Sequence, residues 1–162
     1  MPDNRFGLLI RHAFPFPFLF ISFLQTENFN FLLDCGEGTS FSLLRNRIDP
    51  QTIDAIFISH AHIDHLGGLF LLVQMMHLLR RGIDLNLYIP EEAVEGVRHF
   101  LNTCYLSPDT ISFRIRLNPV TGRFELEHNG IIIKAFPHGH LMGNQREIDK
   151  LKLPNKMQSF CY

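Results

Sequence analysis

The chain has 162 residues, enough for one domain with a hydrophobic core. Its formal net charge is −1 and its isoelectric point is about 6.7, so it lacks the overall basic charge typical of nucleic-acid-binding domains, although an active-site groove can be basic locally. Three cysteines at the irregular positions 35, 104 and 161 argue against a disulfide framework and indicate a reducing compartment, so we expect a cytoplasmic protein.

The N-terminal part of the chain is expected to form strands near 7–12, 17–25 and 29–34. The segment 13–24 has the apolar composition of a signal peptide, but Pro15 and Pro17 interrupt it. Its uninterrupted apolar part is too short to span a bilayer, and no small-residue cleavage site follows. A hairpin of phenylalanine-rich strands is therefore expected, without a membrane partner; a targeting or membrane-associated segment is the alternative.

The middle of the chain alternates between expected strands and helices. The helices are placed at about 39–47, 66–80 and 91–101, and the strands at 55–59, 84–90, 111–117, 123–128 and 130–136. The helix at 66–80 is expected to bury Leu69, Val73 and Met76 against the sheet that carries Phe57 and Leu33. Along the chain, strands come first and are followed by strands that alternate with helices. This order of elements is typical of an α/β sandwich.

Four potential metal ligands fall within the hexapeptide His60-Ala61-His62-Ile63-Asp64-His65. A helix cannot aim all four at one point, because its side chains fan out at 3.6 residues per turn. A turn between the strand at 55–59 and the helix that opens at Leu66 can do so. Imidazole suits zinc, and carboxylate suits harder ions or a bridging role. His60 and His62 are expected to share one metal, while Asp64 and His65 start a second site.

Two segments of the chain resemble the metallo-β-lactamase superfamily. They are Phe31–Thr39, which ends in Asp34-Cys35-Gly36-Glu37-Gly38-Thr39, and Ile53–Leu69, which contains the hexapeptide. The first run is typical of the tRNase Z (ribonuclease Z) branch, whereas the hexapeptide occurs throughout the superfamily. The resemblance covers residues 29–141, with a weaker similarity at 159–162. It implies an α/β fold, the metallo-β-lactamase-like αββα sandwich, of which this chain carries the N-terminal half and the start of the second.

The resemblance also implies further site residues. Superfamily members complete the first metal site with a His at the end of a later strand, and here His138 and His140 both follow the strand at 130–136. Gly139-His140-Leu141 resembles the family's third motif, which favours His140 and leaves His138 as an outer or substrate-contacting group that can protonate a leaving oxygen. Asp34 is expected to orient the ligands. The implied cofactor is one or two zinc ions, with manganese or iron as alternatives.

The implied activity is that of a metal-dependent hydrolase. The resemblance favours a tRNase Z-like phosphodiesterase or endoribonuclease that cuts precursor tRNA with a metal-activated water, with Asp64 orienting that water or taking its proton. A superfamily hydrolase of a small substrate, such as a cyclic nucleotide, phosphonate ester, lactone or thioester, is the second hypothesis, because fold does not settle function. A non-catalytic remnant is the third.

The C-terminal residues 157–162 predict the opening of another strand, and the family's bridging Asp, its final His and its tRNA-gripping arm have no counterpart in the chain. We therefore expect residues 1–162 to form a single but incomplete domain. Such a chain is expected to hold at most one metal tightly, to be a weak hydrolase or none, and to self-associate or form a homodimer. A short, complete protein with an edge strand at 158–162 is the competing hypothesis.

Overall fold

The structure is a computed structural model that describes the backbone of residues 9–12 and, with side chains, residues 22–162. The expected strands at 7–12 and 17–25 are present in their described parts. Residues 7–8 and 17–21 of those predictions, and most of the apolar segment 13–24, lie outside the described residues. Within the described residues, no helix is both long enough and apolar enough to cross a membrane.

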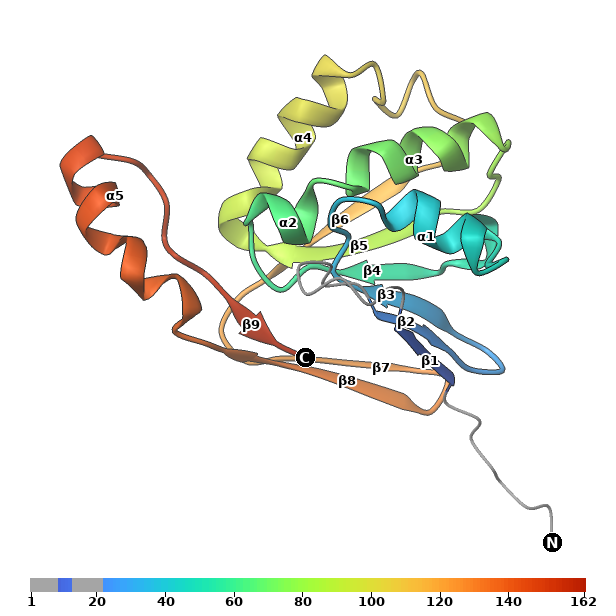
Figure 1. The fold of residues 1–162 in the computed structure, drawn as a ribbon, viewed down its shortest axis with the longest axis horizontal. Coiled ribbons are helices and arrows are strands. Elements are labelled where there is room, and N and C mark those ends of the chain that lie inside the picture. Colours follow the sequence, from blue (N-terminus) through green and yellow to red (C-terminus); the bar gives the residue numbers. More distant parts are fainter. Residues whose placement is uncertain (1–8, 13–21) are drawn as a thin grey trace, which may run out of the picture.

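A six-stranded sheet forms the centre of the molecule (Figure 1). Its strands follow chain order: β1 (Leu9–His12), β2 (Ser22–Gln25), β3 (Asn30–Leu33), β4 (Ala55–Phe57), β5 (Leu85–Pro90) and β6 (Ile115–Val120). The first three strands pair antiparallel, and β3 to β6 pair parallel, with Leu33 opposite Phe57. Parallel strands end at the same edge, so the residues that follow β3 and β4 come together there.

Helices cover one face of this sheet. They are α1 (Thr39–Arg45), α2 (Ile63–Leu66), α3 (Leu69–Leu78) and α4 (Val94–Thr103), with 3₁₀ turns η1 (Pro50–Thr52) and η2 (Glu91–Ala93). As predicted, Leu69, Val73 and Met76 of α3 are fully buried, and they belong to one core cluster with Leu32 and Ile56 of the sheet. Alternate strand residues point to opposite faces, so this core uses every second residue of β3 and β4.

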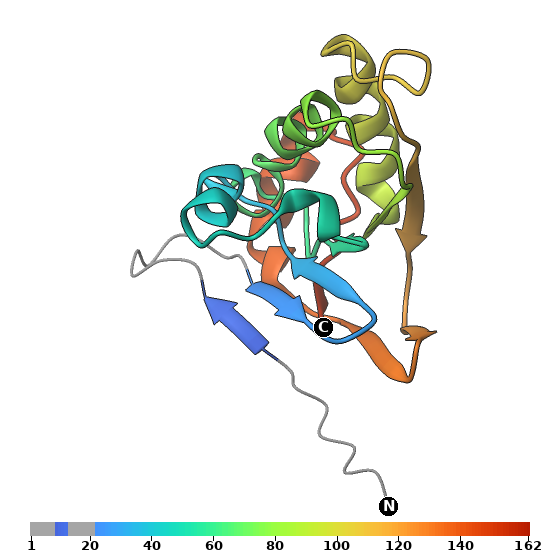
Figure 2. The ribbon, with the colours of Figure 1, turned by 90° about the vertical axis from the view of Figure 1, so that its right-hand side faces the viewer.

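A second, antiparallel sheet lies against the other face of the first (Figures 1 and 2). It consists of β7 (Phe124–His128), β8 (Ile131–Pro137) and β9 (Phe160–Cys161). Phe31, Phe57 and Ile133 form the core between the two sheets. The chain between β8 and β9 forms η3 (His140–Asn144) and α5 (Gln145–Leu151). Helix α5 stands away from the body in Figure 1, and none of its residues is buried. The described layers are therefore helix, sheet and sheet.

Three sequence predictions need correction. The expected helix at 66–80 is two helices, because the chain breaks at Gly67-Gly68, and α2 begins at Ile63 and includes Asp64 and His65. Phe57 and Leu33 do not contact α3, since both face the second sheet. The strand expected at 111–117 begins at Ile115, after a turn that is closed by hydrogen bonds around Ser107 and Thr110.

Candidate metal site

The histidines at the end of β4 approach each other closely. His60 is 4% exposed, and its Nε2 lies 3.1 Å from Nδ1 of His62. His62 has extended backbone angles at the residue before α2, so the two side chains, two positions apart, reach the same side of the loop. Zinc–nitrogen bonds of about 2.0–2.1 Å in a tetrahedral site place two ligand nitrogens about 3.3 Å apart. The spacing of this pair therefore fits a shared metal.

His140 joins the pair from η3, eighty residues along the chain. One nitrogen from each of His60, His62 and His140 lies within 4.8 Å of the other two. The His140 ring centroid is 4.8 Å from that of His60 and 5.5 Å from that of His62. Two ligands of one zinc lie at most about 4.2 Å apart, so the rings would have to move slightly closer together to share an ion. The exposed ring of His140 has the freedom to make that movement.

Asp34 and Asp64 lie on either side of His65. Nδ1 of His65 is 2.8 Å from Oδ2 of Asp34, and its Nε2 is 3.8 Å from Oδ2 of Asp64. The Asp34 carboxylate also accepts hydrogen bonds from the backbone N–H of Ser59 at 2.7 Å and from its hydroxyl at 3.0 Å. These bonds fix the His65 ring so that Nε2 lies on the Asp64 side, as expected for an outer carboxylate that orients a ligand.

Backbone contacts hold the loop after β3 against α2. The Cys35 N–H donates to the carbonyl of His65 at 2.7 Å, and the Gly68 N–H donates to the carbonyl of Cys35 at 2.9 Å. A Cβ on Gly36 would lie 1.8 Å from the carbonyl oxygen of Asp64, and one on Gly68 would lie 1.8 Å from the carbonyl oxygen of Gly36. Only glycine permits this approach, which places Asp34 beside the loop that carries His60, His62 and His65.

The electrostatics of the site favour a neutral His60. Burial, followed by the neighbouring His65 and His62, lowers the pKa of His60 to about 4. A neutral imidazole keeps a lone pair available at physiological pH, and metal coordination requires that form. The buried His60 therefore offers a nitrogen ligand without the cost of removing a proton.

His138 occupies a different place from His140. Its Nδ1 accepts the backbone N–H of His140 at 3.1 Å, its ring centroid is 6.4 Å from that of His140, and it is not in the three-histidine group. It lines the same open cavity, of about 310 Å³, as Ser59, His60, Asp64, His65 and His140. The geometry thus groups His140 with His60 and His62 and leaves His138 on the wall of the cavity.

Several side chains at the site were not singled out from the sequence. Ser59 contacts Asp34 and lies with its Oγ 2.9 Å from Nδ1 of His60. Asn144 Nδ2 lies 3.4 Å from Nε2 of His62. Ser59 had a local signal, because it directly precedes the hexapeptide, whereas Asn144 reaches the site from η3 by tertiary folding alone.

A helix–sheet–sheet fold with a His-x-His-x-Asp-His loop after a central parallel strand defines a protein of the metallo-β-lactamase superfamily. The family model described as Anti-Pycsar protein Apyc1 matches residues 20–157, and the chain belongs to this family. Among curated proteins, the chain is similar to ribonuclease Z of Pyrococcus abyssi, with 33% identity over 117 residues that cover 72% of this chain and 37% of the relative. Ribonuclease Z of Pyrococcus horikoshii is 36% identical over 109 residues, 67% of this chain and 34% of the relative.

Among solved structures, human tRNase Z, short form, is similar with a TM-score of 0.63 and 21% identity, covering 81% of this chain and 57% of that one. At this identity the likeness shows the fold, and it confirms the predicted fold class. The chain spans just over a third of the length of the curated ribonuclease Z relatives that it matches. It is a ribonuclease Z-like member of the superfamily, as the motif at 34–39 predicted.

Proposed function

We propose that this chain carries the metal-binding part of a metal-dependent hydrolase that cleaves phosphodiester bonds. The convergence of His60, His62 and His140 from two distant parts of the chain is the observation that carries the proposal. The adjacent Asp34–His65 pair supports it, because ligating histidines are held by outer carboxylates. Zinc is the ion that three imidazoles suit best, while manganese or iron becomes the alternative where Asp64 takes part.

Each nearby residue has a proposed part in the reaction. A bound zinc ion would supply Lewis acidity and lower the pKa of water toward 7. Asp64, exposed and lining the cavity, binds metal and orients the attacking water or accepts its proton. His65, fixed by Asp34, adds a donor beside Asp64. His138 is exposed on the cavity wall, where it can protonate a leaving oxygen.

Precursor tRNA, cut 3′ to the discriminator base, is the proposed substrate because the matched curated relatives are named ribonuclease Z. A small phosphodiester such as a cyclic nucleotide is the second candidate, because the matching family model carries a description other than ribonuclease. The free thiols of Cys35, Cys104 and Cys161 support the proposed location in the reducing cytoplasm.

The test loads purified protein with zinc, measures bound metal, and assays three substrates: precursor tRNA, a 3′,5′-cyclic nucleotide and bis(p-nitrophenyl) phosphate. His62→Ala should remove both metal binding and turnover. His99→Ala, on the exposed face of α4, is the matched control and should change neither. Turnover of tRNA alone supports the endoribonuclease, and turnover of the cyclic nucleotide alone supports the second candidate. A chain that binds no zinc would contradict the proposal, and zinc binding without any turnover would favour a non-catalytic metal protein.

A further inference from the structure

Ser159 connects the two strand ends that carry the histidines. On one side it pairs with His60 in an isolated antiparallel bridge, and the next residue, Phe160, donates its N–H to the carbonyl of Ser59 at 2.9 Å. On the other side the Ser159 carbonyl accepts the N–H of His138 at 2.8 Å, and the Ser159 hydroxyl donates to the His138 carbonyl. Ser159 is only 4% exposed. One buried residue therefore joins the His60 loop to His138, which directly follows β8 and lies two residues before His140.

Glu92 fixes the chain immediately before Ser159. Its carboxylate accepts the backbone N–H of Lys156 and, at 2.7 Å, that of Gln158. Its own N–H donates to the side-chain oxygen of Gln158 at 2.9 Å. Glu92 lies in η2, directly after β5 of the central sheet, so it ties the returning chain to the rigid body of the fold. Hydrogen bonds to an ionised carboxylate are about twice as strong as neutral ones.

Glu91 provides a contrast at the adjacent position. Its contact with the same segment is an ion pair at 3.1 Å with the Lys156 ammonium group, and both side chains are about half exposed. Exposed ion pairs contribute little to stability. Glu92 makes backbone hydrogen bonds from a half-buried position, while Glu91 makes a surface charge contact, so the two residues differ in what they can hold in place.

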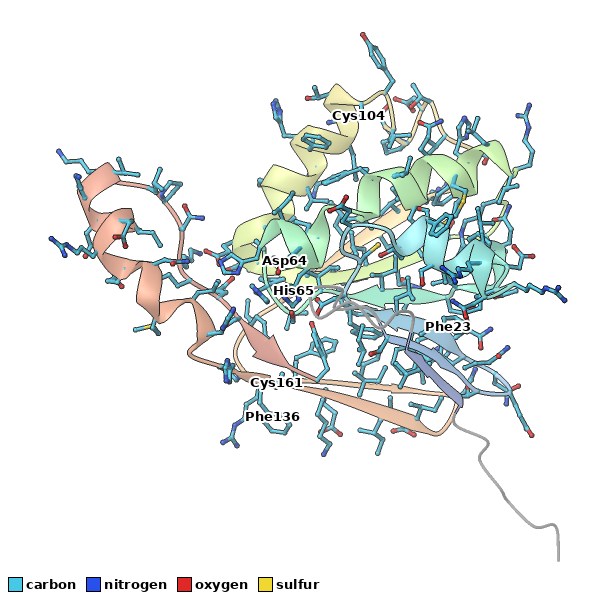
Figure 3. All side chains as sticks on the ribbon, in the orientation of Figure 1. Phe23, Asp64, His65, Cys104, Phe136 and Cys161 are labelled. Carbon is cyan, nitrogen blue, oxygen red and sulfur yellow. The ribbon has the colours of Figure 1, made fainter. Side chains whose placement is uncertain are left out.

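The segment that carries His140 needs such an anchor. His140 is exposed, and α5, which follows η3, buries none of its residues. Figure 3 shows this segment standing away from the body after β8, which carries Phe136, and returning to it at β9, which carries Cys161. Ser159 holds the chain where the excursion begins, through His138, and Glu92 holds it where the excursion ends, through Lys156 and Gln158. A metal ligand must be held to within about 0.5 Å to bind well.

We propose that Glu92 and Ser159 are positioning residues that set the distance between His140 and the His60–His62 pair. The inference rests on the proposed metal site and names two residues that hold it without contacting the ion. The Ser159 side chain acts on the His138 carbonyl, two residues before His140, and the Glu92 side chain holds the backbone just before Ser159. Their loss should therefore loosen the third ligand and leave His60 and His62 in place.

The test measures zinc affinity by competition with a chromophoric chelator in Glu92→Gln, Ser159→Ala and the matched control Glu91→Gln. Glutamine at 92 keeps one acceptor oxygen and loses the other. We expect Glu92→Gln and Ser159→Ala to weaken zinc binding about 10- to 100-fold, the range seen when outer-shell partners are removed. Glu91→Gln should bind as the wild type does. Thermal midpoints, measured in parallel without metal, show that the variants are folded.

Amide hydrogen exchange on the metal-free protein provides the second readout. Protection of the His138 and Phe160 amides should fall in Glu92→Gln and Ser159→Ala and stay unchanged in Glu91→Gln. If all variants bind zinc equally while the wild type binds it, the positioning role is overturned and the proposed function stands. If the wild type binds no zinc, the proposed function fails, and the positioning role fails with it. Unchanged protection in both variants would also overturn the inference, whatever their affinities.

Discussion

Asp34 and His65 are 31 residues apart in sequence, and their side chains meet at 2.8 Å between Oδ2 and Nδ1. Asp34 has a positive φ of 61°, an uncommon conformation for a residue other than glycine, and it is stabilised there by three hydrogen-bonding contacts to its carboxylate. The conformation turns the carboxylate from the end of β3 toward the loop after β4. The pair therefore links the strained end of one strand to the candidate metal site at the end of the next.

Asp34→Ala should weaken metal binding about 10- to 100-fold, because His65 loses the group that orients it. It should also lower the free energy of unfolding by about 1–3 kcal/mol, since the Ser59 N–H is left without its partner. Asp54→Ala is the matched control: Asp54 accepts the Asn30 N–H at 2.8 Å beside the same sheet, away from the histidines. The control should lose stability and keep its metal affinity, measured by chelator competition and urea unfolding. Equal effects on affinity in both variants would contradict the role of Asp34.

Purified chain should hold one metal ion tightly and a second one loosely. Within the described residues, three histidines converge on one point, whereas the neighbouring position has only Asp64 and His65 as donors. Two ions close together also repel each other, and that repulsion is large where water is partly excluded. Metal analysis after dialysis against a weak chelator should give about one ion per chain in the wild type and in His138→Ala, and none in His140→Ala. A chain that retains two ions would show that further donors take part.

The core of α3 should tolerate no charge. Val73 is fully buried, whereas Leu71, two residues earlier on the same helix, is 65% exposed. Val73→Asp should leave the protein unfolded, because a buried carboxylate without a partner is strongly unfavourable. Met76→Ala should cost about 2–5 kcal/mol through lost burial and the remaining cavity. Leu71→Asp serves as the control and should unfold at nearly the wild-type urea concentration.

Helix α3 also shows how much of the core could be predicted from the sequence. The apolar positions of 66–80 predicted that Leu69, Val73 and Met76 are buried, and they are. The prediction that these residues pack on Phe57 and Leu33 was wrong, because Phe57 faces the second sheet and stacks on Tyr88. A strand buried on both faces is apolar at every position, so its sequence does not say which residues face which layer. The packing of the helices on one face and of the second sheet on the other decides which residues face which layer.

The site could be predicted in part for a similar reason. His60, His62, Asp64 and His65 lie in one hexapeptide, and local spacing reveals them together. His140 was found through its motif after β8, and the choice over His138 came from the resemblance. Glu92 and Ser159 had no local signal, because the Glu92 contacts join segments more than 60 residues apart and the Ser159–His138 contact joins residues 21 apart. A single sequence carries no direct record of such contacts.

The metal-free protein should lose stability as the pH falls from about 6.5 toward 4. Burial lowers the pKa of His60 from 6.5 to about 4, so over this interval the unfolded chain binds a proton at this residue that the folded chain does not. Stability therefore rises with pH across the interval, by up to about 3 kcal/mol from this group, and is fully present above pH 6.5. Urea unfolding in EDTA at several pH values measures the slope. His60→Gln should flatten it, and His99→Gln should not.

Thiol labelling should distinguish the three cysteines. Burial raises the pKa of the Cys35 thiol to about 12, so at pH 8 this residue has almost no reactive thiolate. Cys104, at the end of α4, and Cys161, on β9, are exposed in well separated places (Figure 3). Treatment of the folded protein with an aromatic disulfide reagent at pH 8 should therefore modify two thiols per chain rapidly, and the third only after denaturation. Cys35→Ser should leave the rapid count at two, whereas Cys104→Ser should reduce it to one. Rapid modification of Cys35 in the folded protein would mean that the loop after β3 opens, and with it the contacts that hold Asp34 beside the histidines.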